Sequence, residues 1–288
     1  MIPKYPSAAK EVKNQAKQTL NQAIANPWIE RLARFGYAAK GVLYITIGIL
    51  ATQVALGLGG QVTGSEGALK TIMTQPFGKF LLLGIAVGLV GYVVWRSVQA
   101  ILDPEYQGIA PQRVIVRLGY ALSGLSYSGL AFAAAKLIAG FDEEDQGDSS
   151  IGWTAHLLAQ PFGRWFVALV GAVVIAVGFS YFYSAYKAEF CNQFKVIEMS
   201  KIELAWATHL GRLGLSARGS VYGVIGIFLI QAALQYNAEE AKGLRGALQA
   251  IAGQPFGLFL LGVIAVGLIA YGIHELVLAR YRRIIECD

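Results

Sequence analysis

Charged residues are scarce in this 288-residue chain, and that scarcity excludes an ordinary soluble domain. Asp, Glu, Lys and Arg make up 15% of the sequence, whereas a soluble chain carries about a quarter. Hydrophobic residues reach 55% and the mean hydropathy is +0.50. The few charges cluster between apolar stretches, as a protein that crosses a membrane several times requires.

Cysteine and histidine are also rare, with two and three copies. Two cysteines with no metal-type spacing predict neither a disulfide framework nor a metal site. The acidic run 142–148 resembles a calcium loop but has Trp153 in place of the closing Glu, so it predicts a solvated loop. Metal or haem ligation would be the alternative for the scattered histidines. The histidines are His156, His209 and His274.

Catalytic motifs are missing as well. The run Gly57-Leu58-Gly59-Gly60 is not followed by Gly-Lys-Ser/Thr, so it predicts no phosphate loop. No nucleophile is paired with a base, and the polar start of the chain predicts no cleavable signal peptide. We therefore expect no cofactor, no metal and no enzyme.

Six apolar runs are long enough to cross about 30 Å of hydrocarbon at roughly 20 residues each. They must be helices, because lipid offers no partner to unpaired backbone groups and barrel strands would alternate in polarity. The fold class is thus all-α, a polytopic membrane protein. The predicted spans are Ala38–Leu58, Gly78–Val98, Tyr120–Ala139, Phe162–Ala185, Gly219–Tyr236 and Phe256–Leu278.

Basic residues predict the orientation of these spans. Of the 24 Lys and Arg, 18 fall in the N-terminal segment, the second and fourth connections and the C-terminal tail. Both termini and the connections around Asp103 and Cys191 should therefore be cytoplasmic. The net charge of +6 would attract anionic lipids at that face and does not indicate nucleic-acid binding. Residues 7–25 could form a basic amphipathic helix on the leaflet or a frayed tail.

Two motifs recur three times. Gln-Pro-Phe-Gly begins at Gln75, Gln160 and Gln254, and an Arg-x-Gly motif precedes each copy by 41 to 43 residues. These motifs begin at Arg34, Arg117 and Arg212. One unit of two helices is thus repeated three times, which fixes the architecture.

Two helices return the chain to its starting side, so the three repeats should be parallel and related by a pseudo-threefold axis along the membrane normal. The expected division is an N-terminal segment and three repeats, the last with a basic tail: residues 1–30, 31–110, 111–200 and 201–288. A short interfacial helix should end each outer connection, at residues 67–73, 153–159 and 246–252. Proline should then turn the corner, ending the short helix at Gln and entering the first turn of the next span. These corner prolines are Pro76, Pro161 and Pro255.

The repeat resembles a bacterial family of multi-span membrane proteins, domain of unknown function 1206, over residues 31–281. The resemblance rests on Arg34-x-Gly36-Tyr37-x-x-Lys40-Gly41-x-x-Tyr44, the Gln-Pro-Phe-Gly copies and Gly88-Leu89-x-Gly91-Tyr92. The second repeat departs, with Ser123 at the basic position and Ala176-Val177 in place of Gly91-Tyr92. The resemblance implies a bacterial inner-membrane protein and no particular activity.

Polar residues occur in register across the repeats, and polar groups inside a bilayer usually face the bundle interior. The expected cytoplasmic layer comprises Lys40, Arg96, Ser123, Tyr181, Arg218 and Glu275. A tyrosine layer follows one turn deeper at Tyr44, Tyr127 and Tyr222, and an outer layer at Gln53, Lys136 and Gln231. We expect Glu275 to pair with Arg218 of its own repeat. Snorkelling of the cations to the interface is the alternative.

The architecture without site chemistry predicts a structural or interaction protein of the bilayer. Its partners would be the lipid bilayer itself, anionic lipids at the cytoplasmic face and a protein of unknown identity. The alternative is a small transporter or channel with an axial polar pathway. The mitochondrial carriers share the three-repeat architecture, but their proline–acidic signature is missing here.

Overall fold

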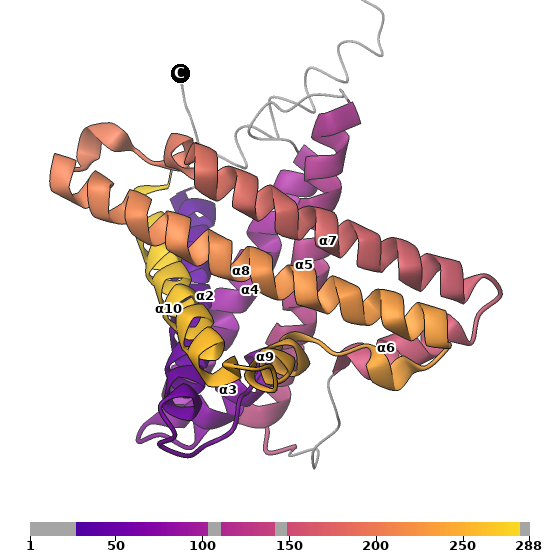
Figure 1. Ribbon diagram of the computed structural model, residues 1–288. Coiled ribbons are helices and arrows are strands. Elements are labelled where there is room, and N and C mark those ends of the chain that lie inside the picture. The colour runs from indigo at the N-terminus through magenta and orange to yellow at the C-terminus, as the bar shows by residue number, and fades with distance from the viewer. Residues whose placement is uncertain (1–26, 103–110, 142–148, 283–288) are drawn as a thin grey trace, which may run out of the picture.

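The computed structural model describes residues 27–102, 111–141 and 149–282. The predicted N-terminal helix, the connection around Asp103, the acidic run 142–148 and Cys287 lie outside these residues. In the described part the chain is helical, and six helices are long and apolar enough to cross a membrane (Figure 1). The all-α polytopic prediction is therefore confirmed. The six long helices are α2 (Pro27–Ala55), α4 (Gly78–Leu102), α5 (Pro111–Ile138), α7 (Gly163–Lys187), α8 (Lys201–Gln235) and α10 (Gly257–Tyr281).

A short helix lies in the connection between the two long helices of each repeat, at the position where the sequence predicts one. These helices are α3 (Ser65–Met73), α6 (Ser149–Leu158) and α9 (Leu244–Ala252). Three 3₁₀ turns complete the described chain, at η1 (Glu189–Gln193), η2 (Val196–Glu198) and η3 (Ala238–Glu240).

Several long helices begin well before the predicted spans, because hydropathy marks the hydrocarbon-facing part and capping sets the end. The largest difference is α8, which begins at Lys201 rather than near Gly219. Ser200 and Glu203 form a capping box there: the Glu203 carboxylate accepts from the Ser200 amide at 2.8 Å, and the Ser200 hydroxyl accepts from the Glu203 amide at 3.2 Å. Helices α2 and α5 both begin at a proline, which suits the first helical position.

The repeats follow one another in cyclic order. Each first helix packs along the second helix of the preceding repeat: α2 on α10, α5 on α4, and α8 on α7. Small residues set the same register at two of these crossings. A Cβ on Gly41 would lie 2.7 Å from the Gly272 carbonyl oxygen, and one on Gly219 would lie 2.8 Å from that of Gly178. Such close backbone approach is how membrane helices gain van der Waals contact.

The repeats differ in how their own two helices meet. In repeats 1 and 3 these helices pack, with a Gly36 Cβ only 2.6 Å from the Tyr92 amide nitrogen and a Gly214 Cβ 2.5 Å from that of Tyr271. Helices α5 and α7 of repeat 2 share almost no contacts along their described residues. The equivalent glycine, Gly119, would place a Cβ in open space.

The second repeat's sequence explains why its pair is open. Val173 stands where repeats 1 and 3 have Gly88 and Gly267, and Val177 stands where repeat 1 has Tyr92. Branched side chains hold the helix axes apart where glycine lets them approach. We call the unpacked region between α5 and α7, marked by Gly119, Val173 and Val177, the α5–α7 junction. It interrupts an otherwise threefold ring of helices.

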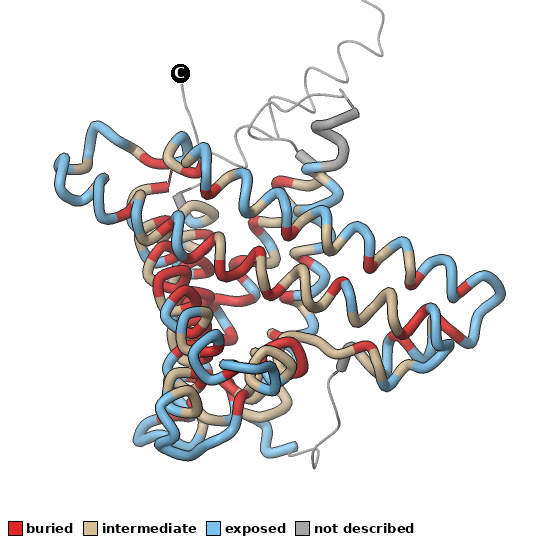
Figure 2. Tube along the Cα trace, viewed as in Figure 1, coloured by how far each residue is buried: buried red, intermediate tan, exposed pale blue. Residues whose placement is uncertain are grey.

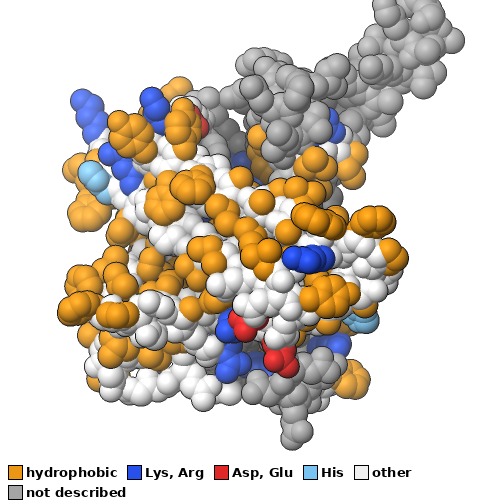
Figure 3. All heavy atoms as spheres, turned by 45° about the vertical axis from the view of Figure 1, so that its right-hand side comes forward, with side chains coloured by type: hydrophobic (Ala, Val, Ile, Leu, Met, Phe, Trp, Pro, Cys, Tyr) orange, Lys and Arg blue, Asp and Glu red, His pale blue; other side chains and the backbone are white. Residues whose placement is uncertain are grey.

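Burial follows the same asymmetry. Figure 2 shows buried residues concentrated on α2, α10 and the middle of α8, whereas α7 is largely exposed. Within their apolar windows α10 is 50% buried and α2 44%, but α5 only 22% and α7 17%. Hydrophobic side chains cover much of the surface in Figure 3, as a lipid-facing exterior requires.

The Gln-Pro-Phe-Gly corner differs from the prediction. In the third copy the short helix ends at Ala252, two residues before Gln254, and α10 begins at Gly257, so Pro255 lies between the helices. The Gly257 amide donates to the Gln254 carbonyl at 2.7 Å, which closes a tight turn. The first and second copies close the same turn, around Pro76 and Pro161, with amide-to-carbonyl distances of 2.7 and 2.9 Å.

The corner phenylalanines adopt left-handed backbone conformations in all three copies, with φ between +60° and +64°. An L-residue with a side chain resists that conformation by about 1–2 kcal/mol. All three rings are at least 80% exposed. Exposed aromatic rings at the ends of spans suit the membrane–water interface. The three residues are Phe77, Phe162 and Phe256.

Candidate functional site

A buried ion pair lies at the centre of the helix bundle. The Lys40 ammonium of α2 is 2.7 Å from a Glu275 carboxylate oxygen of α10, and both side chains are at most 3% exposed. Lys40 also donates to the Tyr271 hydroxyl at 2.7 Å and to the Tyr92 hydroxyl at 3.3 Å. An ammonium has three donors, so all three are matched by protein groups. Burial excludes snorkelling for Lys40.

The predicted pairing of Glu275 with Arg218 is wrong. Glu275 pairs with Lys40 of repeat 1, because α10 and α2 approach closely at Gly41 and Gly272. Gly41 directly follows Lys40, and Gly272 lies three residues, or about one helical turn, before Glu275. The Arg218 guanidinium of α8 donates instead to the hydroxyls of Tyr271 and Tyr222, the latter at 3.0 Å. The sequence indicated a shared depth but not which neighbouring helix would face the carboxylate.

Arg218 sits among four tyrosine rings and is 5% exposed. Cations are attracted to the faces of such rings. No carboxylate of the described residues forms an ion pair with Arg218, and its Nε has no hydrogen-bond partner there. The rings belong to Tyr44, Tyr181, Tyr222 and Tyr271, with centroids 5.4, 5.0, 5.2 and 4.7 Å from the guanidinium carbon.

Arg96 of α4 is the third cation of the layer and is only half-buried. It donates to the Tyr92 hydroxyl at 2.8 Å and to the Gln99 side-chain oxygen at 2.9 Å. Its guanidinium also lies over the Tyr120 ring of α5, 4.9 Å from the centroid. Ser123 is 3.5 Å from the same Tyr92 hydroxyl. The predicted cytoplasmic layer therefore gathers around the tyrosines of repeats 1 and 3.

The predicted tyrosine layer also gathers, though unequally. Tyr127 donates to the Tyr44 hydroxyl at 3.4 Å, and both are buried. Tyr222 is half-buried beside Arg218, with its ring 5.5 Å from that of Tyr181. We call the predicted cytoplasmic and tyrosine layers, together with Tyr92, Tyr120 and Tyr271, the central polar layer. All six long helices contribute to it, and α7 does so through Tyr181. The outer set is less shielded, with Gln53 exposed and Lys136 and Gln231 half-buried.

The arginine that opens the repeat motif has a role that sequence reasoning missed. Arg34 donates to the Ala279 carbonyl at the end of α10, at 2.9 Å. Arg117 donates to the carbonyls of Ala100 and Ile101 at the end of α4, each at 2.9 Å. Cations near the last carbonyls satisfy unpaired acceptors and the helix dipole. Arg34 thus binds repeat 1 to repeat 3, and Arg117 binds repeat 2 to repeat 1. In the sequence, the recurrence of the motif was the only signal of this role.

The histidines are dispersed, and within the described residues no group of three or more His, Cys, Asp or Glu could hold a metal ion. His274 is 2% exposed and lies against the rings of Phe190 and Phe194, at centroid distances of 5.0 and 5.8 Å. These phenylalanines come from the connection between α7 and α8, which packs over the end of α10. His156 and His209 lie elsewhere, on α6 and α8.

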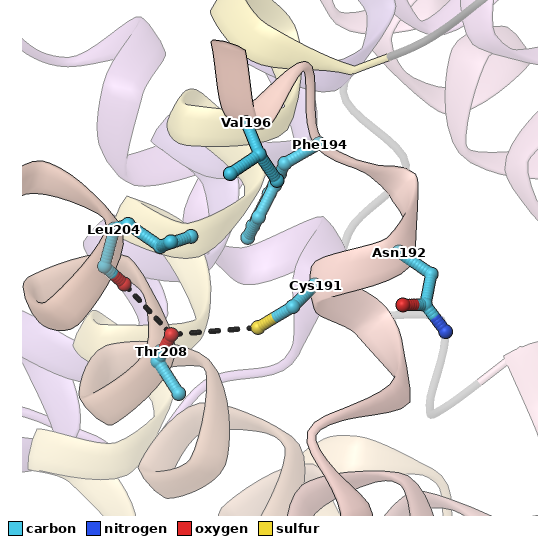
Figure 4. Close-up of a pocket in the computed structure, with 6 residues that line it drawn as sticks. All are labelled: Cys191, Asn192, Phe194, Val196, Leu204 and Thr208. Carbon is cyan, nitrogen blue, oxygen red and sulfur yellow. Dashed lines mark hydrogen bonds between the residues drawn. The ribbon is translucent and has the colours of Figure 1, made fainter. Parts of the chain in front are cut away.

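That connection also carries a pocket of about 360 Å³, shown in Figure 4. The half-buried Cys191 faces it, with its sulfur 3.4 Å from the Thr208 hydroxyl. Thr208 in turn donates to the Leu204 carbonyl at 2.7 Å. A second, apolar groove of about 150 Å³ runs between α7 and α8 along Gly178 and Gly219. Neither cavity is lined by the central polar layer.

Comparison with known proteins matches the repeat architecture. A family model described as Domain of Unknown Function (DUF1206) matches three times, at residues 35–103, 118–188 and 213–282. The chain belongs to this family. The chain is also 36% identical over 256 residues to the uncharacterized protein YxxB of Bacillus subtilis (strain 168), covering 89% of this chain and 92% of that one. No solved structure matches. The family model therefore matches the divergent second repeat as well as the two regular ones.

Proposed function

We propose that this protein of the DUF1206 family is a structural or interaction protein of the bacterial inner membrane, acting by binding rather than by catalysis. The observation that carries the proposal is the matched set of donors on Lys40. Its ammonium is bound by Glu275, Tyr271 and Tyr92, so this buried cation needs no water or substrate to satisfy its three donors. A pathway for ions or solutes would need such water or a substrate in its place.

The charge of the same layer favours a second candidate, a small transporter or channel for anions. Arg96 and Arg218 each lie near tyrosines, and Glu275, the one buried carboxylate of the described residues, is paired with Lys40. Uncompensated cations along a membrane pathway favour anions.

Flux through proteoliposomes distinguishes the two candidates. We expect vesicles containing the purified protein to be no more permeable to chloride or phosphate than empty vesicles. Lys40→Met should leave them equally tight while lowering thermal stability. Protein-dependent anion flux that falls in Lys40→Met or Arg218→Gln would overturn the structural role and support the transport role.

The proposed topology places both termini and Cys191 on the cytoplasmic side, supported by the distribution of basic residues. In a Cys287→Ser background, a membrane-impermeant thiol reagent should label Cys191 in inside-out vesicles and leave it unlabelled in intact cells. Cys191→Ser in the same background is the control for labelling elsewhere. Labelling in sealed cells would reverse the proposed orientation.

A further inference from the structure

The three central cations form a row whose two ends lie beside the unpaired helices. Lys40, at the middle, shares Tyr92 with Arg96 and Tyr271 with Arg218. At one end Arg96 lies over Tyr120 of α5, and at the other Arg218 lies over Tyr181 of α7, each about 5 Å from the ring centroid. These are the two helices of repeat 2, which share almost no contacts along their described residues.

The layer is closed toward α2 and α10 and open toward the α5–α7 junction. Members on the closed side are less than 9% exposed, including Lys40, Tyr44 and Glu275. The half-buried members all belong to the four helices on the other side. They are Arg96, Tyr120, Ser123, Tyr181 and Tyr222.

The helix faces that flank the junction are apolar and uncovered. In α4 the equivalent positions, Gly88 and Gly91, are buried, whereas Val173 and Ala176 of α7 are exposed. On α5, Leu122 is 57% exposed. An apolar face inside a bilayer that no helix covers is solvated by lipid chains.

Charge decides what occupies the polar end of the junction. Arg218 is buried with no carboxylate partner among the described residues, and its Nε has no hydrogen-bond partner. The Glu275 carboxylate is already paired with Lys40. An anion with several acceptor oxygens would complement both arginines, as phosphate does for guanidinium groups. Arg96 lies six residues, or about 9 Å, before the end of α4, a depth that a headgroup can reach.

We propose that the α5–α7 junction binds an anionic phospholipid of the cytoplasmic leaflet. Its headgroup phosphate would approach the row of cations from the junction and bind Arg96 and Arg218 at the two ends, and its acyl chains would lie along the exposed faces of α5 and α7. This inference rests on the proposed interaction function and names the partner. The divergence of repeat 2 then has a consequence, because closing this pair as in repeats 1 and 3 would exclude the lipid.

The test uses the full-length protein in detergent, titrated with phosphatidylglycerol or phosphatidylcholine, with bound lipid counted by native mass spectrometry. We expect selective retention of phosphatidylglycerol. Arg96→Gln should weaken its binding about tenfold, as loss of a charged hydrogen bond does. Arg212→Gln is the matched control, because Arg212 is an exposed cation of the same predicted side, and it should change binding less than twofold.

A second variant avoids reliance on charge removal alone. Val173→Gly combined with Val177→Tyr gives the second repeat the glycine and the tyrosine that repeat 1 has at these two positions. The variant should close the junction and abolish selective binding while the protein stays folded. Equal binding of the two lipids, retention of selectivity in both variants, displacement by millimolar inorganic phosphate, or a lipid-free dimer through this face would each overturn the proposal. Anion flux in the vesicles would instead refute the proposed function and leave the lipid site standing.

Discussion

Replacing Glu275 by glutamine is expected to lower the free energy of unfolding by about 3–5 kcal/mol, the cost of breaking a buried ion pair from one side. The substitution leaves the Lys40 ammonium inside the bundle with two tyrosine hydroxyls and no negative charge. Lys40→Met should be similarly destabilising, because it leaves the Glu275 carboxylate buried and unpaired. Unfolding of the purified protein in mixed micelles, followed by SDS titration, measures both.

The double variant Lys40→Met/Glu275→Gln separates a coupled pair from two independent losses. It should lose clearly less than the sum of the single variants, since it removes both charges together. Lys195→Gln is the matched control: Lys195 pairs with Glu198 at 3.4 Å, but their side chains are 35% and 57% exposed. That change should cost no more than about 1 kcal/mol. Strictly additive losses at Lys40 and Glu275 would show that the pair does not hold the bundle.

Much of this fold could be predicted from the sequence because the bilayer imposes simple rules. Length and hydropathy located the six spans, and the repeated motifs indicated their parallel arrangement. Helix ends were less predictable, since they depend on local caps such as Ser200 and Glu203 rather than on hydropathy. The corner at Pro255 was misjudged for the same reason: a hydrogen bond from Gly257 to Gln254 closes a turn there.

The polar layer was predicted in composition but not in its pairings. Alignment of the repeats placed Lys40, Arg218 and Glu275 at similar depth in the membrane. The depth of a residue depends only on its position along its own helix. The partner of Glu275 depends on which helices approach most closely, and that is set between repeats by Gly41 and Gly272. No alignment of one repeat on another contains this information, so the sequence supported the wrong neighbour.

The departure of repeat 2 was visible in the sequence, but its consequence was not. Ala176-Val177 in place of Gly91-Tyr92 could have been a neutral exchange of one apolar residue for another. The structure gives it a physical meaning, because those positions form the contact between the two helices of repeat 1. Losing the glycine and the tyrosine removes both the close approach and the hydroxyl that binds the central cations.

Equivalent glycines should therefore respond differently to the same substitution. Gly36→Ala would place a methyl group 2.6 Å from the Tyr92 amide nitrogen, and Gly214→Ala 2.5 Å from that of Tyr271. Backbone cannot move aside as a flexible side chain can, so the helices must separate. We expect each change to lower the free energy of unfolding by about 2–3 kcal/mol, as overpacking does. SDS titration of the purified variants is the measurement.

Gly119→Ala is the matched comparison from the open repeat, where the added methyl group meets nothing within 4 Å. Alanine also favours the helix by roughly 0.5–1 kcal/mol over glycine, so this variant should be as stable as the natural protein or slightly more stable. Similar losses at all three glycines would mean that α5 and α7 pack in the membrane as the other pairs do. Losses at Gly36 and Gly214 alone would support a second repeat whose two helices do not pack together. The central polar layer would then be accessible from the lipid through the α5–α7 junction.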